Sequence, residues 1–114
     1  MPPHNITFGR SSEDAACAYI TALGMRIIQR NARAPGGEID IIAREGDTIA
    51  FIEVKARKGP RFGSALSGVD ARKRRRLRAA AADFLQFFAP QAYARFDVLA
   101  IDGSRMTLHR NAFR

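Results

Sequence analysis

The sequence is poor in cysteine and in long apolar runs. Cys17 is the single cysteine, which excludes an internal disulfide and a cysteine-based zinc site and is typical of a reducing compartment. No segment approaches the about 18 consecutive apolar residues that span a bilayer. The first residues also lack the basic flank and apolar stretch of a secretory signal. We therefore expect a cytoplasmic protein without a membrane-embedded part.

Acidic residues are outnumbered. The chain has 11 Asp and Glu against 19 Lys and Arg, which gives a net charge of +8 and a pI near 11.0. Such a protein attracts polyanions, because neutralised phosphates release their condensed counterions. Nucleic acid is therefore the leading partner class, and the alternative is a solvated, arginine-rich surface. At 114 residues the chain fits one domain, residues 1–114, in which we expect residues 1–10 to be flexible.

Hydrophobic periodicity predicts the order α-β-β-β-α-β-β. Ser11 and Ser12, followed by two acids, are typical of a helix start, and Ala16, Tyr19, Ile20 and Leu23 then share one helical face. A second helix is predicted over 69–89, with one stripe formed by Leu77, Ala81, Phe84, Leu85 and Phe88. The predicted strands are 25–31, 38–44, 48–57, 94–101 and 106–109. The fold class is α/β, with a mixed sheet flanked by helices.

Three charged side chains interrupt the two most apolar strands. Glu53 and Lys55 lie two residues apart and so point to the same face of one strand. Asp40 lies between isoleucines on the preceding strand, and a hairpin brings it beside Glu53. Because unpaired charges are costly to bury, two adjacent carboxylates call for a cation between them.

Magnesium fits this arrangement because it prefers oxygen ligands and takes one or two carboxylates, which leaves places for water and phosphate. Asp40 and Glu53 are the candidate ligands, the backbone carbonyl of Val54 is a further one, and manganese is an alternative ion. Lys55 then faces the scissile phosphate or the attacking water. In the alternative interpretation, Glu53 and Lys55 form a solvated pair on a half-exposed sheet and Asp40 caps a turn.

Two segments resemble the hallmark of the YraN family of bacterial proteins: GEIDIIA over 37–43 and FIEVKAR over 51–57. Shorter matches are Phe62-Gly63, the pattern Lys73-xx-Arg76-Leu77 and Arg95-Phe96-Asp97-Val98. The resemblance runs from about Ser12 to Phe113. The family is similar in fold to the restriction-endonuclease-like PD-(D/E)xK superfamily, and nearest in style to archaeal Holliday junction resolvases.

The resemblance implies a restriction-endonuclease-like core with metal ligands at Asp40 and Glu53 and a catalytic lysine at Lys55. It also implies that Glu13 of the first helix completes the catalytic and metal site, although a first-turn acid beside the helix dipole explains Glu13 equally well. Ser12 stands where the family usually has glycine, and Ile39 replaces the proline of the superfamily's name. Neither change removes a candidate ligand.

The remaining candidates are basic or aromatic. Five Arg and one Lys in positions 72–78 repel one another unless an anion is near, which favours phosphate contact through Arg72, Lys73, Arg75 and Arg76. Lys73 also lies on the Leu77 stripe and so is expected to point toward the site. Arg57, Lys58 and Arg61 are candidate nucleic-acid contacts in or beside a glycine-rich loop. Three phenylalanines are expected in the core or at a homodimer face: Phe84, Phe87 and Phe88. Asp97 is expected to pair with Arg95 or another basic group.

Two functions follow from these residues. The first is a metal-dependent nuclease that hydrolyses phosphodiester bonds in DNA, with branched or recombining DNA as the substrate class that the resemblance implies. The second is a non-catalytic nucleic-acid-binding or scaffold protein that retains the fold. Inward-facing acids favour the nuclease, because a protein that only binds a phosphate backbone gains nothing from placing carboxylates toward it.

Overall fold

The computed structural model describes residues 7–35, 37–57 and 71–113, without the side chains of 7–11 and 57. These residues form two helices and five strands. In chain order they are α1 (Thr7–Ala22), β1 (Arg26–Ala34), β2 (Gly37–Glu45), β3 (Thr48–Arg57), α2 (Ala71–Phe88), β4 (Tyr93–Asp102) and β5 (Arg105–Phe113). The predicted order α-β-β-β-α-β-β is confirmed.

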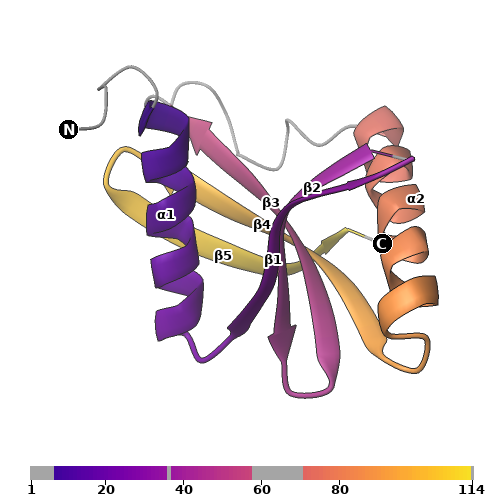
Figure 1. The fold of residues 1–114 in the computed structure, drawn as a ribbon. Helices are drawn as coiled ribbons and strands as arrows, with labels where there is room; N and C mark the ends of the chain where they lie inside the picture. The colour runs from indigo at the N-terminus through magenta and orange to yellow at the C-terminus, as the bar shows by residue number, and fades with distance from the viewer. Residues whose placement is uncertain (1–6, 36, 58–70, 114) are drawn as a thin grey trace.

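The five strands form a single mixed sheet in the order β1-β2-β3-β4-β5. Neighbouring strands run antiparallel except β3 and β4, which are parallel. Parallel neighbours need a crossover connection, and the connection between β3 and β4 contains α2. The two helices lie on opposite sides of the sheet, with α1 on one face and α2 on the other (Figure 1). The predicted α/β class with a mixed sheet between helices is confirmed.

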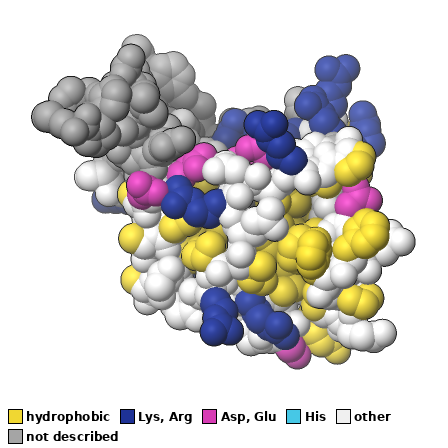
Figure 2. All heavy atoms as spheres, in the orientation of Figure 1, with side chains coloured by type: hydrophobic (Ala, Val, Ile, Leu, Met, Phe, Trp, Pro, Cys, Tyr) yellow, Lys and Arg dark blue, Asp and Glu magenta, His cyan; other side chains and the backbone are white. Residues whose placement is uncertain are grey.

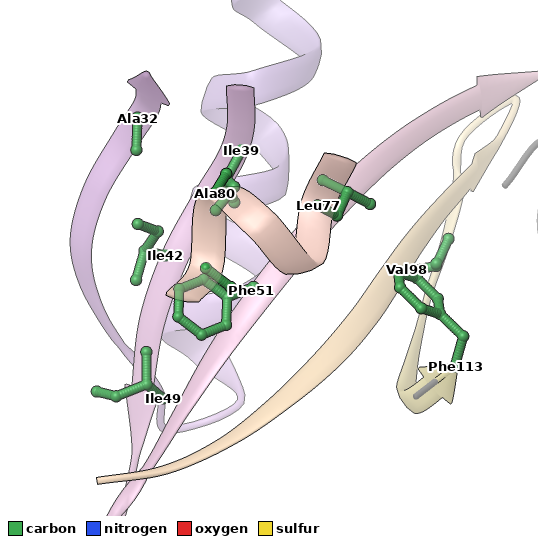
Figure 3. Close-up of a cluster of buried hydrophobic side chains, with 10 residues drawn as sticks. Ala32, Ile39, Ile42, Ile49, Phe51, Leu77, Ala80, Val98 and Phe113 are labelled. Carbon is green, nitrogen blue, oxygen red and sulfur yellow. The ribbon is translucent and has the colours of Figure 1, made fainter. Parts of the chain in front are cut away.

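Each helix covers its own hydrophobic cluster. Between the sheet and α2 lie ten buried side chains, most of them visible in Figure 3: Ala32, Ile39, Ile42, Ile49, Phe51, Leu77, Ala80, Ala81, Val98 and Phe113. Between the sheet and α1 lie Ala16, Ile20, Met25, Ile41, Ala43, Ala50, Ile52 and Leu99. Residues of β3 therefore alternate, with Ala50 and Ile52 toward α1 and Phe51 toward α2. This alternation directs Glu53 to the α2 face.

The first helix begins earlier than predicted. It starts at Thr7, so Ser11 and Ser12 lie inside it and no acidic residue occupies its first turn. The prediction of a serine cap was therefore wrong. Residues 7–10, which were expected to be flexible, belong to this helix, and residues 1–6 lie outside the described residues.

Two predicted core positions lie on the surface. Leu23 follows the end of α1 and is 39% exposed, and Phe88 ends α2 with 73% of its surface exposed. Phe87 is exposed as well, whereas Phe84 packs edge-to-face on Phe51 at 5.9 Å between ring centroids. Only Phe84 of the three phenylalanines therefore joins the core, and the homodimer face stays a prediction.

No helix in the described part of the chain is both long and apolar enough to cross a membrane.

Candidate functional site

The carboxylate of Asp40 links β2 to β3 at the point where their backbone pairing ends. The last paired residues in this direction are Ile41 and Ile52. Beyond this pair, the backbone N–H of Val54 donates a hydrogen bond to Oδ2 of Asp40 at 2.8 Å. The side chain of Asp40 thus satisfies a backbone donor of β3, and this bond orients it beside Glu53, the residue before Val54.

Asp40 and Glu53 form a close acid pair. Glu53 is buried, with 7% of its surface exposed, and Asp40 is half-buried. Burial raises the pKa of Asp40 from 3.8 to about 6, and the charge of Glu53 and a side-chain hydrogen bond to it add to the rise. The N–H of Val54 opposes this rise, as does the charge of Lys73. The hairpin therefore brings the two acids together as predicted.

Lys73 on α2, which packs against this face of the sheet, supplies a positive charge to the acid pair. Its ammonium forms an ion pair with Oε1 of Glu53. Lys73 lies in the first turn of α2, four residues before the buried Leu77, so both point toward the sheet. The prediction that Lys73 points toward the site is confirmed. A buried carboxylate is thus compensated by a cation from the chain itself.

A cavity of about 450 Å³ opens between the start of β2, the middle of β3 and the first turns of α2. It is lined by Gly37, Glu38, Asp40, Glu53, Lys73, Arg76 and Leu77. Gly37 has a φ of 150° and lies against α2, where an added Cβ would be 3.4 Å from Cβ of Arg76. That distance is an ordinary contact, so it is the φ of Gly37, which L residues rarely adopt, that favours glycine at this position.

The acid pair fits a hard divalent cation. The two carboxyls are in contact, and burial and the charge of Glu53 raise the pKa of Asp40, so the pair gains from a positive charge placed between them. The cavity beside them leaves room for water and phosphate oxygens. Asp40 and Glu53 are the residues that would hold the ion. The carbonyl of Val54 as a third ligand stays a prediction.

Two other predicted members of the site lie differently. Lys55 follows Glu53 on the same face of β3 and is half-buried, but it is not among the described residues that line the cavity. Glu13 on α1 contacts β1 instead: Oε2 accepts a hydrogen bond from Asn31 at 3.1 Å and lies 3.5 Å from Arg30. Within residues 7–35, 37–57 and 71–113, no three or more His, Cys, Asp and Glu side chains gather closely enough to hold a metal. The catalytic roles of Glu13 and Lys55 stay predictions.

A basic surface adjoins the cavity. The arginines of the first turns of α2 are exposed, and in Figure 2 Lys and Arg side chains gather at the upper right, over this part of the helix. Arg76 lines the cavity, while Arg72 and Arg75 lie on the same helix outside the cavity lining. The predicted contacts Lys58 and Arg61 lie outside the described residues, as does the side chain of Arg57.

A second buried acid, Asp97, is the centre of a network that is larger than the predicted pair. As predicted, Asp97 pairs with Arg95, whose Nε lies 3.0 Å from both carboxylate oxygens. Asp97 also accepts the backbone N–H of Asn111 at 2.8 Å, and Asn111 has a left-handed φ of 54°. Glu45 bridges Arg95 and Arg110. The bond to Asn111 holds β5 in the sheet beyond its predicted end at His109, and this network joins three strands.

The fold and the site define an α/β protein with an acid pair, a lysine and a basic helix around one cavity. Residues 12–101 match the uncharacterised protein family UPF0102. A UPF0102 protein of Shewanella loihica is 44% identical over 109 residues, which cover 96% of each chain. One from Ralstonia nicotianae is 44% identical over 98% of this chain and 90% of its own. One from Rhodococcus jostii is 43% identical over 86% of this chain and 84% of its own. The chain belongs to the UPF0102 family, which is the YraN family, so the predicted family membership is confirmed.

Proposed function

We propose that this protein is a metal-dependent nuclease with a restriction-endonuclease-like fold, which hydrolyses phosphodiester bonds in DNA. The observation that carries the proposal is the contact between the carboxyls of Asp40 and Glu53 at the edge of a cavity. A carboxyl whose pKa is raised by burial and by a neighbouring acid, as for Asp40, is typical of functional sites.

The surroundings of the acid pair support a phosphodiester substrate. Lys73 and Arg76 line the same cavity, and the exposed arginines of α2 continue the positive surface away from it. A phosphate backbone on this surface releases counterions, and its phosphates can reach into the cavity. The net charge of +8 acts in the same direction over longer distances.

Each residue has one task in this proposal. Asp40 and Glu53 hold the cation, and the bond from Val54 fixes the orientation of Asp40. When bound, a magnesium or manganese ion supplies positive charge to the phosphate and lowers the pKa of water. Lys55 orients the attacking water on the same face of β3, and Arg76 neutralises the phosphate from the helix. Arg72 and Arg75 bind the neighbouring phosphates.

Cleavage assays test the proposal. The purified protein is incubated with single-stranded, duplex, flap and four-way-junction DNA in the presence of magnesium or manganese. We expect metal-dependent cleavage that Glu53→Gln and Lys55→Ala abolish. Glu38→Gln is the matched control, because Glu38 lines the same cavity but lies outside the acid pair. Equal cleavage by the wild type and all variants would identify a contaminating nuclease and contradict the proposal.

A second candidate function is a non-catalytic nucleic-acid-binding protein that retains the fold. The ion pair between Lys73 and Glu53 favours it, because Lys73 already compensates one acid without a metal. Binding of these DNAs without cleavage, unchanged by magnesium, manganese or Glu53→Gln, is the result expected for this function. Metal-dependent cleavage excludes it.

A further inference from the structure

The ammonium of Lys73 lies where the proposed site calls for a cation. It pairs directly with Oε1 of Glu53, and its charge also lowers the pKa of Asp40. We propose that Lys73 is an internal counter-cation that a divalent metal must displace from Glu53, so that metal binding releases Lys73 to bind phosphate. This inference rests on the proposed function, because it needs the acid pair to be the metal site.

Competition follows from burial and charge. Glu53 is 7% exposed, so few oxygen positions are open to water, and one of its oxygens is taken by Lys73. A divalent cation on the same carboxylate would repel the ammonium at a short distance, where water screens poorly. We therefore expect a divalent cation to replace the ammonium of Lys73 at Glu53, not to bind beside it. The free energy needed to remove Lys73 lowers the affinity of the acid pair for metal.

The released side chain has a place to go. Lys73 is 35% exposed in its ion pair, and it lines the cavity together with Arg76. A lysine side chain has several rotatable bonds and can move its ammonium into the cavity while its backbone stays in α2. There it would join Arg76 at a phosphate. Metal and DNA then favour each other's binding, because one releases the cation that the other uses.

A matched pair of variants separates this role from a general charge effect. Lys73→Gln removes the competing cation, and Arg72→Gln removes the same charge from the same turn outside the cavity lining. Manganese binding is measured by titration calorimetry without DNA. We expect Lys73→Gln to bind manganese at least about tenfold more tightly than the wild type, and Arg72→Gln to match the wild type within about twofold. Manganese should also raise the Tm of Lys73→Gln more than that of the wild type.

Lys73→Arg retains the charge and covers the case in which Lys73→Gln folds poorly. Its affinity for manganese should stay close to that of the wild type, and circular dichroism checks the fold of each variant. This inference alone would be overturned by two results together. The wild type binds manganese and loses that binding in Asp40→Asn, while folded Lys73→Gln binds manganese no more tightly than the wild type. Failure of the wild type and Lys73→Gln to bind manganese would contradict both this inference and the proposed metal site.

Discussion

The carboxylate of Asp40 accepts the backbone N–H of Val54 at 2.8 Å, next to the point where β2 and β3 stop pairing. One side chain therefore has two tasks. It satisfies a part-buried donor of the sheet, and it presents its charge beside Glu53. The hydrogen bond needs only an acceptor oxygen, whereas the proposed metal binding needs the negative charge of Asp40.

Substitutions at Asp40 should separate the two tasks. Asp40→Asn keeps an acceptor oxygen for Val54 and removes the repulsion with Glu53, so we expect its free energy of unfolding to equal or exceed that of the wild type without metal. Asp40→Ala leaves the N–H of Val54 without this acceptor and should lower that free energy by about 1–3 kcal/mol relative to Asp40→Asn. Urea unfolding measures both. Equal stability of the two variants would show that the bond to Val54 contributes nothing.

Stability without metal should fall as the pH rises from about 4 to 6. The pKa of Asp40 is raised to about 6 in the folded chain, above its ordinary value of 3.8, so the folded state binds the proton more tightly. The contribution of Asp40 is fully present below the unfolded pKa and is lost as the pH rises through the folded pKa. It amounts to at most about 3 kcal/mol.

The pH prediction is checked by subtraction, because other groups titrate in the same range. The free energy of unfolding of Asp40→Asn is measured from pH 3 to 8 and compared with that of the wild type. The free energy of unfolding of the wild type should fall relative to that of Asp40→Asn between about pH 4 and 6, and the difference should stay constant at higher pH. A difference that is flat over the whole range would mean that the pKa of Asp40 is not raised.

Asp97 should be the acid on which stability depends most. It is fully buried and accepts hydrogen bonds from Arg95 and Asn111. Asp97→Ala removes the acceptor for both and leaves part-buried donors, which should lower the free energy of unfolding by about 2–4 kcal/mol. Asp97→Asn keeps one acceptor oxygen and should lower it less. Urea unfolding measures the free energy of unfolding of both variants. A smaller loss for Asp97→Ala than for Asp97→Asn would contradict this prediction.

Gly37 should tolerate a side chain poorly, because its φ of 150° is a conformation that L residues rarely adopt. Gly37→Ala should lower the free energy of unfolding by about 1–3 kcal/mol through backbone strain, while its added Cβ would lie at an ordinary contact distance of 3.4 Å from Cβ of Arg76. Gly24→Ala is the matched control, since Gly24 also has a positive φ but an added Cβ there meets nothing within 4 Å. Thermal unfolding measures both variants. Losses of similar size are expected because backbone strain acts at both positions, and a Gly37→Ala variant as stable as the wild type would contradict this prediction.

The basic surface of α2 should make DNA binding depend on salt. Arg72→Ala and Arg75→Ala each remove one candidate phosphate contact, so each should weaken binding at low salt and reduce the slope of log K against log salt by about 1. Arg26→Ala on the edge strand β1 is a control of equal charge, distant along the chain. Fluorescence anisotropy with a labelled duplex measures the slopes. Slopes unchanged by the α2 variants would place the DNA elsewhere.

Much of the fold and part of the site follow from sequence patterns alone. Strand alternation predicted the inward direction of Glu53, the hairpin predicted its contact with Asp40, and the Leu77 stripe predicted the direction of Lys73. Each of these is a local rule of periodicity. The serine cap failed because Ser-Ser-Glu-Asp satisfies the same capping pattern inside a helix that continues toward the N-terminus.

Other features depend on contacts that no local pattern specifies. The bond from Val54 to Asp40 requires the backbone pairing to end at Ile41, and the length of β5 depends on Asp97 receiving the N–H of Asn111. Phe88 carries the spacing of a core residue, yet it is 73% exposed as the last residue of α2. Tertiary packing decides these positions, not periodicity.

A manganese-soaked crystal tests the central claim, that Asp40 and Glu53 form a divalent cation site, most directly. An anomalous difference map locates manganese without reference to activity. We predict one peak with a carboxylate oxygen of Asp40 and one of Glu53 at about 2.1 Å, as for hard divalent cations. Manganese bound elsewhere, or a map without a peak at the acid pair at saturating manganese, would contradict the claim.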